Sequence, residues 1–283
     1  MSSTSKIYPG YLGALSIGGG SKIRCTDFNV NYSQDILFYN HIIGLLDNIT
    51  DGTKLEGASP NIQRTFWRAG TRVVNGSFTF PLAETSYKAM FDLARNATYF
   101  DMAFLYYCNG VSRRFTSCRV NTFSFRSMAG DVATMTIDVM GIGIEEANSS
   151  FQNSSPEKLI TWDLINVNAP EVTDPIQGIE VTINNNCIPI FTAGGNTIKN
   201  YELTPWVIRV GTQEISGIIS AYTNGRPTSS IHTVTTPSNL VIKIKDTEYK
   251  CPIVYRPTNR AAATNAIIAQ LPFVGVDKGF NTA

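Results

Sequence analysis

Charged residues are scarce in this 283-residue chain, at 16% of the sequence, and 23 lysines and arginines nearly balance 22 aspartates and glutamates. A basic face that holds nucleic acid through its phosphates is therefore not indicated. The most apolar run, Ile36–Ile49, is interrupted by Asn40, His41 and Asp47 and is too short to span a bilayer. Because no basic start followed by an apolar core opens the sequence, we expect neither a secretory signal nor membrane insertion.

Histidine and cysteine are also rare. The two histidines, His41 and His232, lie in unrelated contexts, and no pair among the five cysteines has metal-ligand spacing, so we expect no structural zinc site. Without an export signal, reduced thiols are the default. Cys108 and Cys118 could still face each other across a hairpin, and the sequence leaves that pairing open.

Signatures of catalysis are missing as well. The chain contains no G-x-S-x-G, no H-E-x-x-H and no G-x-G-x-x-G between a strand and a helix. Carboxylates are scattered, mostly in predicted turns, and only the fold could bring two of them together. We therefore expect no enzyme and no cofactor.

What the sequence does contain is alternation typical of half-buried strands. In Lys22–Ser33, Phe28, Val30 and Tyr32 share one face, while Asn29 and its polar neighbours share the other. Similar segments predict a mainly β fold, with strands at Lys22–Ser33, Trp67–Leu82, Tyr99–Cys108, Phe115–Ser127, Val132–Ile144, Leu159–Val167, Ile176–Ile183, Trp206–Tyr222, Asn239–Tyr255 and Ala262–Val276.

One helix is predicted, over Thr85–Ala97. Thr85 or Ser86 can cap its first turn. An apolar stripe at i, i+3, i+4 and i+7 predicts a face that packs on the core: Tyr87, Met90, Phe91 and Ala94.

A repeat organises the chain. The segment Phe66–Gly76 matches Val207–Gly217 at a constant shift of 141 residues, which is the mark of a structural unit used more than once. The identical pairs are Arg68/Arg209, Gly70/Gly211, Thr71/Thr212 and Gly76/Gly217. Weaker matches follow in the same order: Asp27–Ser33 over Gly178–Asn184, Phe125–Arg126 over Tyr255–Arg256, and Gly141–Glu145 over Phe273–Asp277. We predict two tandem domains, residues 1–147 and 158–283, joined by a Ser/Asn-rich linker at 148–157.

The arrangement of the predicted elements is similar to the tail tube fold of long-tailed bacteriophages. Ala69–Phe80 and Arg209–Tyr222 resemble the third-strand region of that family, and the long loop, helix and hairpin follow the same order. The resemblance implies two tail-tube-like β-barrel or sandwich domains, one with a flanking helix. In the second half a Pro- and Thr-rich loop stands in place of the helix, which departs from the family pattern.

The resemblance also implies a function: a structural virion protein of the tail, assembled in the host cytoplasm. Rings of six domains stack into a tube, so three two-domain chains would make one ring. DNA would pass through without specific binding. Sheath, baseplate and tail terminator proteins are the further partners expected.

Two groups of site residues are predicted for such a tube. Uncharged polar residues on strands are candidates for the channel wall, although they could equally coat the outside of a sheet: Asn29, Asn31, Thr134, Thr136 and Thr182. The long polar loop Asp47–Arg68 is the candidate for ring stacking, because long ordered loops often carry contacts. Its charged residues are Asp51, Lys54, Glu56 and Arg64.

Other functions remain open at this point. The same duplicated fold serves in baseplate hub, distal tail and tube-initiator proteins, and in tubes of related contractile injection machines. A duplicated β-sandwich module that binds sugars is the alternative from another class.

Overall fold

The computed structural model describes residues 13–17, 22–42, 63–106, 112–147, 158–191, 198–199, 202–222, 236–256, 268–276 and 281–282. Most of these residues lie in strands, as predicted. The first half contains β1 (Gly13–Ile17), β2 (Lys22–Arg24), β3 (Asp27–Ile42), β4 (Gln63–Pro81), α1 (Tyr87–Asn96), β5 (Phe100–Tyr106), β6 (Ser112–Met128), β7 (Thr134–Gly141) and β8 (Gly143–Ala147). The second half contains the 3-10 helix η2 (Trp162–Leu164), β9 (Ile165–Asn168), β10 (Ile176–Asn184), β11 (Ile188–Ile190), β12 (Ile198–Lys199), β13 (Glu202–Leu203), β14 (Val207–Arg209), β15 (Glu214–Tyr222), β16 (Ser238–Ile244), β17 (Thr247–Tyr255), β18 (Ile268–Gly275) and β19 (Asn281–Thr282).

The two halves share one strand order. In the first half the neighbours run β1-β5-β6-β7-β4-β3, and in the second they run β9-β16-β17-β18-β15-β10. Every one of these pairings is antiparallel. The order therefore repeats strand by strand, with β3 corresponding to β10 and β4 to β15.

The register repeats as well. Val30 lies opposite Gly76 in the first half, and Val181 lies opposite Gly217 in the second. Val181 follows Val30 by 151 residues and Gly217 follows Gly76 by 141, and these are the shifts of the two matches in the sequence. Further along, Val139 pairs with Gly76 and Phe273 pairs with Gly217. Val139 thus corresponds to Phe273, 134 positions later. The sequence match of Gly141–Glu145 with Phe273–Asp277 had predicted a shift of 132 for this strand.

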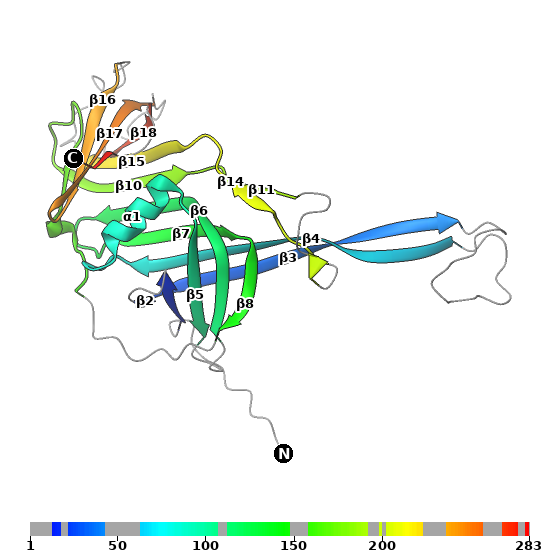
Figure 1. Cartoon of the computed structure of the whole chain (residues 1–283). Helices are drawn as coiled ribbons and strands as arrows, with labels where there is room; N and C mark the ends of the chain where they lie inside the picture. Colours follow the sequence, from blue (N-terminus) through cyan, green and yellow to red (C-terminus); the bar gives the residue numbers. More distant parts are fainter. Residues whose placement is uncertain are drawn as a thin grey trace.

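The halves are joined edge to edge. Strand β6 pairs with β10 through seven consecutive residues, from Thr122 opposite Asn184 to Met128 opposite Gly178. The sheet therefore runs without a break from β3 through β4, β7, β6, β10, β15 and β18 to β17 (Figure 1). We call the β6–β10 pairing the seam. The linker predicted at 148–157 lies outside the described residues, so the domain boundaries stay a prediction.

Helix α1 packs across the seam. The ring of Phe91 lies 4.8 Å from that of Phe123 on β6 and 4.4 Å from that of Tyr249 on β17. The hydroxyl of Tyr87 donates to the carbonyl oxygen of Ile244 at 3.3 Å. All four residues of the predicted stripe are buried, which confirms the packing face; Ser86 occupies the N-cap position, but its side chain makes no capping hydrogen bond.

A buried amide fixes the C-terminal end of α1 to the second half. Asn185 is fully buried, and its Nδ2 donates to the carbonyl oxygens of Ala94 and Val120, both at 2.9 Å. Gln213 Nε2 donates to Asn185 Oδ1 at 2.6 Å and to the carbonyl oxygen of Arg95 at 3.0 Å. Because each buried polar atom has a partner here, the cluster can hold helix and strands in one arrangement.

A second joint lies at the other end of the strands. Ile160, from the second half, donates its N–H to the carbonyl oxygen of Leu82, and its own carbonyl oxygen accepts from the N–H of Ala133. Glu84 receives a hydrogen bond from Lys245 at 2.6 Å and lies 3.5 Å from Lys158. One hydrophobic core extends through both halves.

Strands β3 and β4 continue beyond the body as a two-stranded arm (Figure 1). Pairing is regular from Ile36 opposite Ala69 to Ile42 opposite Gln63. Leu203 of β13 pairs in parallel with Thr71 at the root of this arm. The segment Gln63–Arg68, predicted as part of a loop, is therefore strand; its Phe66 and Trp67 pair with Tyr39 and Phe38 of the apolar run that begins at Ile36.

Candidate functional site: a polar face across both halves

One face of the continuous sheet packs on the core, and from β3 to β15 the other face carries rows of polar residues. Side chains alternate along each strand, so paired residues place their side chains on the same face. In β7, Met135, Ile137 and Val139 are buried, while the residues between them are half-buried. The register extends this division across the seam, and the resulting polar face belongs to both halves.

A row of polar side chains crosses this face from β3 to β15. Consecutive members are paired in the sheet: Asp27, Thr79, Thr136, Ser124, Thr182 and Ser216. Two hydroxyl pairs within the row are hydrogen-bonded, Thr79 with Thr136 at 2.9 Å and Ser124 with Thr182 at 3.0 Å. The second of these bonds spans the seam, so the two halves present one continuous row.

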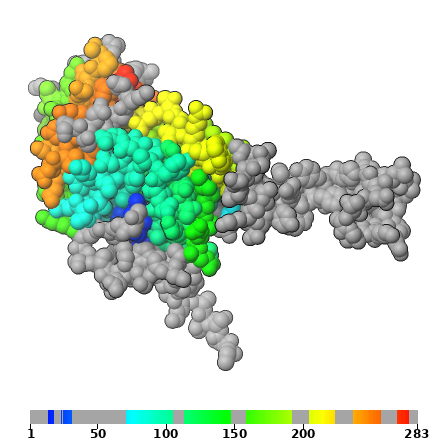
Figure 2. All heavy atoms as spheres, viewed as in Figure 1, coloured from blue at the N-terminus to red at the C-terminus, as the bar shows by residue number. Residues whose placement is uncertain are grey.

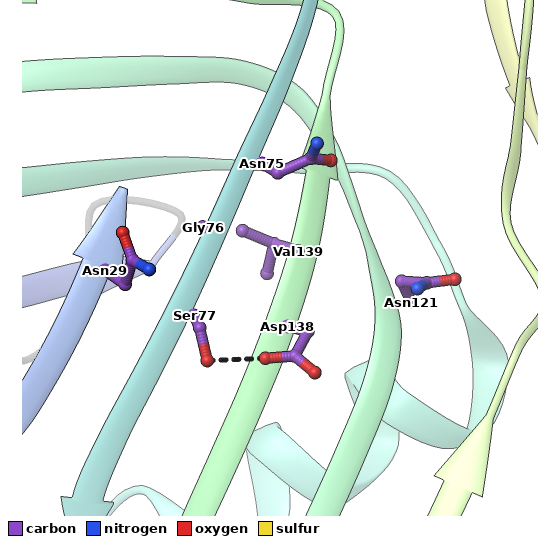
Figure 3. Close-up of a pocket in the computed structure, with 7 residues that line it drawn as sticks. All are labelled: Asn29, Asn75, Gly76, Ser77, Asn121, Asp138 and Val139. Atoms are coloured by element: carbon purple, nitrogen blue, oxygen red, sulfur yellow. Dashed lines mark hydrogen bonds between the residues drawn. The ribbon is translucent and has the colours of Figure 1, made fainter. Parts of the chain in front are cut away.

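A parallel row lies one step closer to the arm: Asn29, Ser77, Asp138, Thr122, Asn184 and Glu214. The hydroxyl of Ser77 donates to Asp138 at 2.6 Å (Figure 3). Around this pair the face is hollowed by about 200 Å³, and Asn29, Asn75 and Asn121 contribute amides to the lining (Figure 3). These groups offer hydrogen bonds to water without a strong positive charge.

A third row lies on the other side of the first and includes Thr134, Arg126 and Glu180, paired in that order. Across the three rows the carboxylates are Asp27, Asp138, Glu180 and Glu214, and the only cation is Arg126. The face is therefore polar with a small excess of negative charge, which disfavours contact with phosphate groups.

The structure brings together most of the residues predicted for a channel wall. Asn29, Thr136 and Thr182 belong to the first two rows, and Thr134 to the third. Asn31 pairs with Asn75 on the neighbouring step of the same strands. Sequence reasoning missed the members that β4, β6 and β15 supply, although alternation of Thr122, Ser124 and Arg126 within the predicted strand Phe115–Ser127 carried the signal.

The residues predicted for ring stacking are only partly described. Asp51, Lys54 and Glu56 lie outside the described residues, and Arg64 lies on β4 of the arm, opposite His41.

The repeated glycines lie where neighbouring groups approach closely. A Cβ on Gly217 would lie 2.2 Å from the carbonyl oxygen of Glu180 and 2.4 Å from the ring of Phe273, and a Cβ on Gly76 would lie 2.6 Å from the ring of Phe78. Gly211 approaches Asn186 in the same manner, at 2.8 Å from its carbonyl oxygen. No larger residue fits without displacing these groups. The remaining members of the motif, Arg68, Gly70 and Arg209, lie on β4 and β14.

Two of the buried cysteines have thiols of low reactivity. Burial raises the pKa of the Cys25 and Cys118 thiols to about 12, so neither is a thiolate near neutral pH. Cys118 is free, while Cys108 lies outside the described residues. Within the ranges given above, no three His, Cys, Asp or Glu side chains gather as they would around a metal ion.

No helix among the described residues is long and apolar enough to cross a membrane.

Comparison with known proteins gives one finding. The model of a family described as phage tail tube protein matches residues 50–274 of the chain. The match includes β4, the seam, the helix and nearly all of the second half. No curated protein matches the chain.

Proposed function

The chain belongs to the phage tail tube protein family, and from this premise we propose that three copies close into a ring and that rings stack into a hollow tube. Membership makes it a structural component of the virion tail. The proposal adds that the polar face lines the channel, that DNA passes along it without specific binding, and that assembly takes place in the host cytoplasm.

The seam is the observation that carries this proposal. Within one chain, β6 of the first half adds to the edge of β10, the first long strand of the second half. Strand β3 holds the position of β10 in the repeat, and its one partner among the described residues is β4. An unpaired edge of this kind is a template for another strand. The second half of a neighbouring copy can therefore add to β3 as β6 adds to β10.

Repeating the seam accounts for closure. Each chain contributes two units of the same strand order, and a ring of six units needs three chains. Closure leaves no free edge, which removes the risk of uncontrolled edge-to-edge association. The three polar rows would then recur in each chain around the wall, separated by β18 and β17, where Val274 and Val254 take the positions of the first row.

The polar face suits a channel for DNA. Threonine, serine and asparagine side chains keep the wall hydrated, while Asp27, Asp138, Glu180 and Glu214 repel phosphates. Neutralisation of phosphates by lysine and arginine would instead make DNA adhere. Arg126 is the one cation of the three rows, and its paired neighbour Glu180 offsets its charge.

Ring stacking is assigned to the β3–β4 arm and the segment at its tip. This segment carries Asp51, Lys54 and Glu56, and Arg64 lies on the arm itself. An arm that leaves the body along the strand direction can reach a neighbouring ring (Figure 1). The tube would end against baseplate and tail terminator proteins, and a sheath would surround it in a contractile tail.

Deletion of Gly52–Ser59 tests the stacking role. In the sequence the deleted residues fall between the paired strands Asp27–Ile42 and Gln63–Pro81, so we expect the body to fold and rings to form, while tubes are lost in electron micrographs. Tubes of unchanged length would remove the arm from the contact.

Native mass spectrometry of the purified chain tests ring formation. We expect assemblies whose masses are multiples of three chains. Rings of six full-length chains, or a monomer that never assembles at any concentration, would overturn the proposal.

A further inference from the structure

The connection between β10 and β15 is the counterpart of the arm. In the first half the outer parts of β3 and β4 form the arm, and the paired residues Gln34 and Arg72 lie at its root. With the shifts of 151 and 141, these positions correspond to Asn185 and Gln213, which are hydrogen-bonded to each other. The residues between them form a shorter ribbon, β11 paired with β14. Figure 1 shows this ribbon on the side of the body from which the arm extends.

The ribbon exposes apolar side chains. Trp206 is 67% exposed and Ile188 57% exposed, which are the two highest values among large apolar residues in the described ranges. The next, Val276 at 52%, directly follows β18 at the same end of the sheet. Figure 2 shows the segment that contains β14 and β15, in yellow, at the molecular surface. A single exposed apolar residue needs no explanation, but the three most exposed large apolar residues of the described ranges all lie at this end of the sheet, and exposed apolar area often marks a contact.

The ribbon is fixed to the body rather than held only at its ends. Ile208 is fully buried, and the hydroxyl of Tyr99 accepts from its N–H at 2.9 Å and donates to its carbonyl oxygen at 3.0 Å. The guanidinium of Arg119 lies 3.8 Å above the Tyr99 ring. The backbone N–H of Trp206 donates a hydrogen bond to the carbonyl oxygen of Ile190 at 2.8 Å. A prearranged apolar surface loses little conformational entropy when a partner binds.

A second group of exposed apolar residues lies at the opposite end of the strands. There the exposed large apolar residues are Val132, Leu159, Tyr222 and Ile268. Tyr222 and Ile268 are paired at the ends of β15 and β18, and Leu159 bridges to Ala83 just beyond β4. Apart from Tyr99, whose hydroxyl holds the ribbon, every exposed large apolar residue described thus lies at one end or the other.

We propose that the β11–β14 ribbon, through Trp206 and Ile188, is a second ring-stacking contact and that its partner is the opposite end of another copy of this chain. The inference rests on the proposed function, since it requires rings that stack head to tail. Such a heterologous contact generates an open filament. With three arms and three ribbons per ring, each of the six units would supply one contact to the next ring.

The test uses full-length variants that block one end each. The ribbon variant carries Ile188→Glu and Trp206→Glu, and the opposite-end variant carries Leu159→Glu and Ile268→Glu. We expect each to form three-chain rings by native mass spectrometry and to need at least about tenfold more protein to polymerise, because a buried tryptophan anchor is commonly a dominant contact. Ala89→Glu, on the exposed side of α1, is the matched control and should polymerise as the unaltered chain does.

Mixing the two variants makes the test directional. The intact opposite end of a ribbon variant can bind the intact ribbon of an opposite-end variant, so the mixture should stop at pairs of rings. Polymerisation of the ribbon variant at the same concentration as the unaltered chain would overturn this inference and leave the proposed tube intact. Absence of three-chain rings from the unaltered chain would instead overturn the proposed function.

A measurement on the unaltered chain avoids dependence on folding of the variants. Hydroxyl-radical labelling of Trp206 and Ile188 should be strong in rings and lost in tubes. Equal labelling in both states would overturn the contact.

Discussion

Gly217 shows how tightly single residues constrain the packing of the sheet. We expect Gly217→Ala to destabilise the unassembled chain by about 1–3 kcal/mol, the usual range for overpacking, because the added Cβ would meet the Glu180 carbonyl oxygen at 2.2 Å and the Phe273 ring at 2.4 Å. Urea unfolding followed by circular dichroism measures the change. Ser216→Ala, at the exposed neighbouring position, is the control and should stay within about 0.5 kcal/mol of the unaltered chain. Equal effects of the two substitutions would contradict the close approach.

For single residues, the sequence predicted the face of the sheet on which a side chain lies better than it predicted which side chains are in contact. Alternation placed Asn29, Thr134, Thr136 and Thr182 on a polar face, and the register brings them together. It could not show that Ser124 and Thr182 are hydrogen-bonded, because they are 58 residues apart and no local pattern encodes their pairing.

Helix α1 is the element whose packing joins the two halves. Phe91→Ala should cost about 3–5 kcal/mol, since the ring packs against Phe123 and Phe125 of the first half and Tyr249 of the second. Because the helix contributes to both halves, we expect tryptophan fluorescence and circular dichroism to follow one shared urea transition in the unaltered chain. Two separate unfolding transitions, of which the substitution shifts only one, would contradict the joint core. Leu93→Ala, on the half-buried side of the helix, should cost less.

The joint at Glu84 gives stability a dependence on pH. The hydrogen bond from Lys245, aided by the charge of Lys158, lowers the pKa of the Glu84 carboxyl below its ordinary value of 4.5. A carboxyl with a lowered pKa in the folded state stabilises the protein above its unfolded pKa and loses that contribution as the pH falls through the folded pKa. Glu84→Gln should therefore lower the urea midpoint at pH 7, and the difference from the unaltered chain should shrink below pH 4.5.

The unassembled chain, kept dilute, is the sample for this comparison, and Glu214→Gln at an exposed position of β15 is the control. A difference of the same size at pH 7 and pH 3 would show that the charge of Glu84 does not matter.

Elements with regular alternation were predicted well, and those without it were not. The helix Thr85–Ala97 was found from its periodicity, whereas the predicted strand Lys22–Ser33 is divided into β2, which pairs with β1, and β3, which pairs with β4. Strand β3 also runs on to Ile42, and this extension was not predicted, because Ile36–Ile42 does not alternate between apolar and polar residues and so lacks the period that marks a strand. The predicted strand Trp206–Tyr222 is divided into β14 and β15, since Gly211 turns the chain towards Asn186.

For the whole molecule, the pattern of pairing matters more than any single side chain. The repeat was visible in the sequence, and its first two shifts are reproduced by the register of Val30 with Gly76 and of Val181 with Gly217. The β6–β10 pairing of the seam could not be predicted from the sequence, because the residue pattern of an edge strand is the same whether its partner strand belongs to the same chain or to another.

Electron cryomicroscopy of assembled particles tests this account most directly, because it resolves what lies beside β3. The account predicts a closed wall in which the outer edge of β3 pairs with the second half of a neighbouring chain, three chains to a ring, with Asp27, Thr136 and Thr182 facing the channel. A particle in which that edge has no strand beside it, or in which the polar rows face outward, would contradict it.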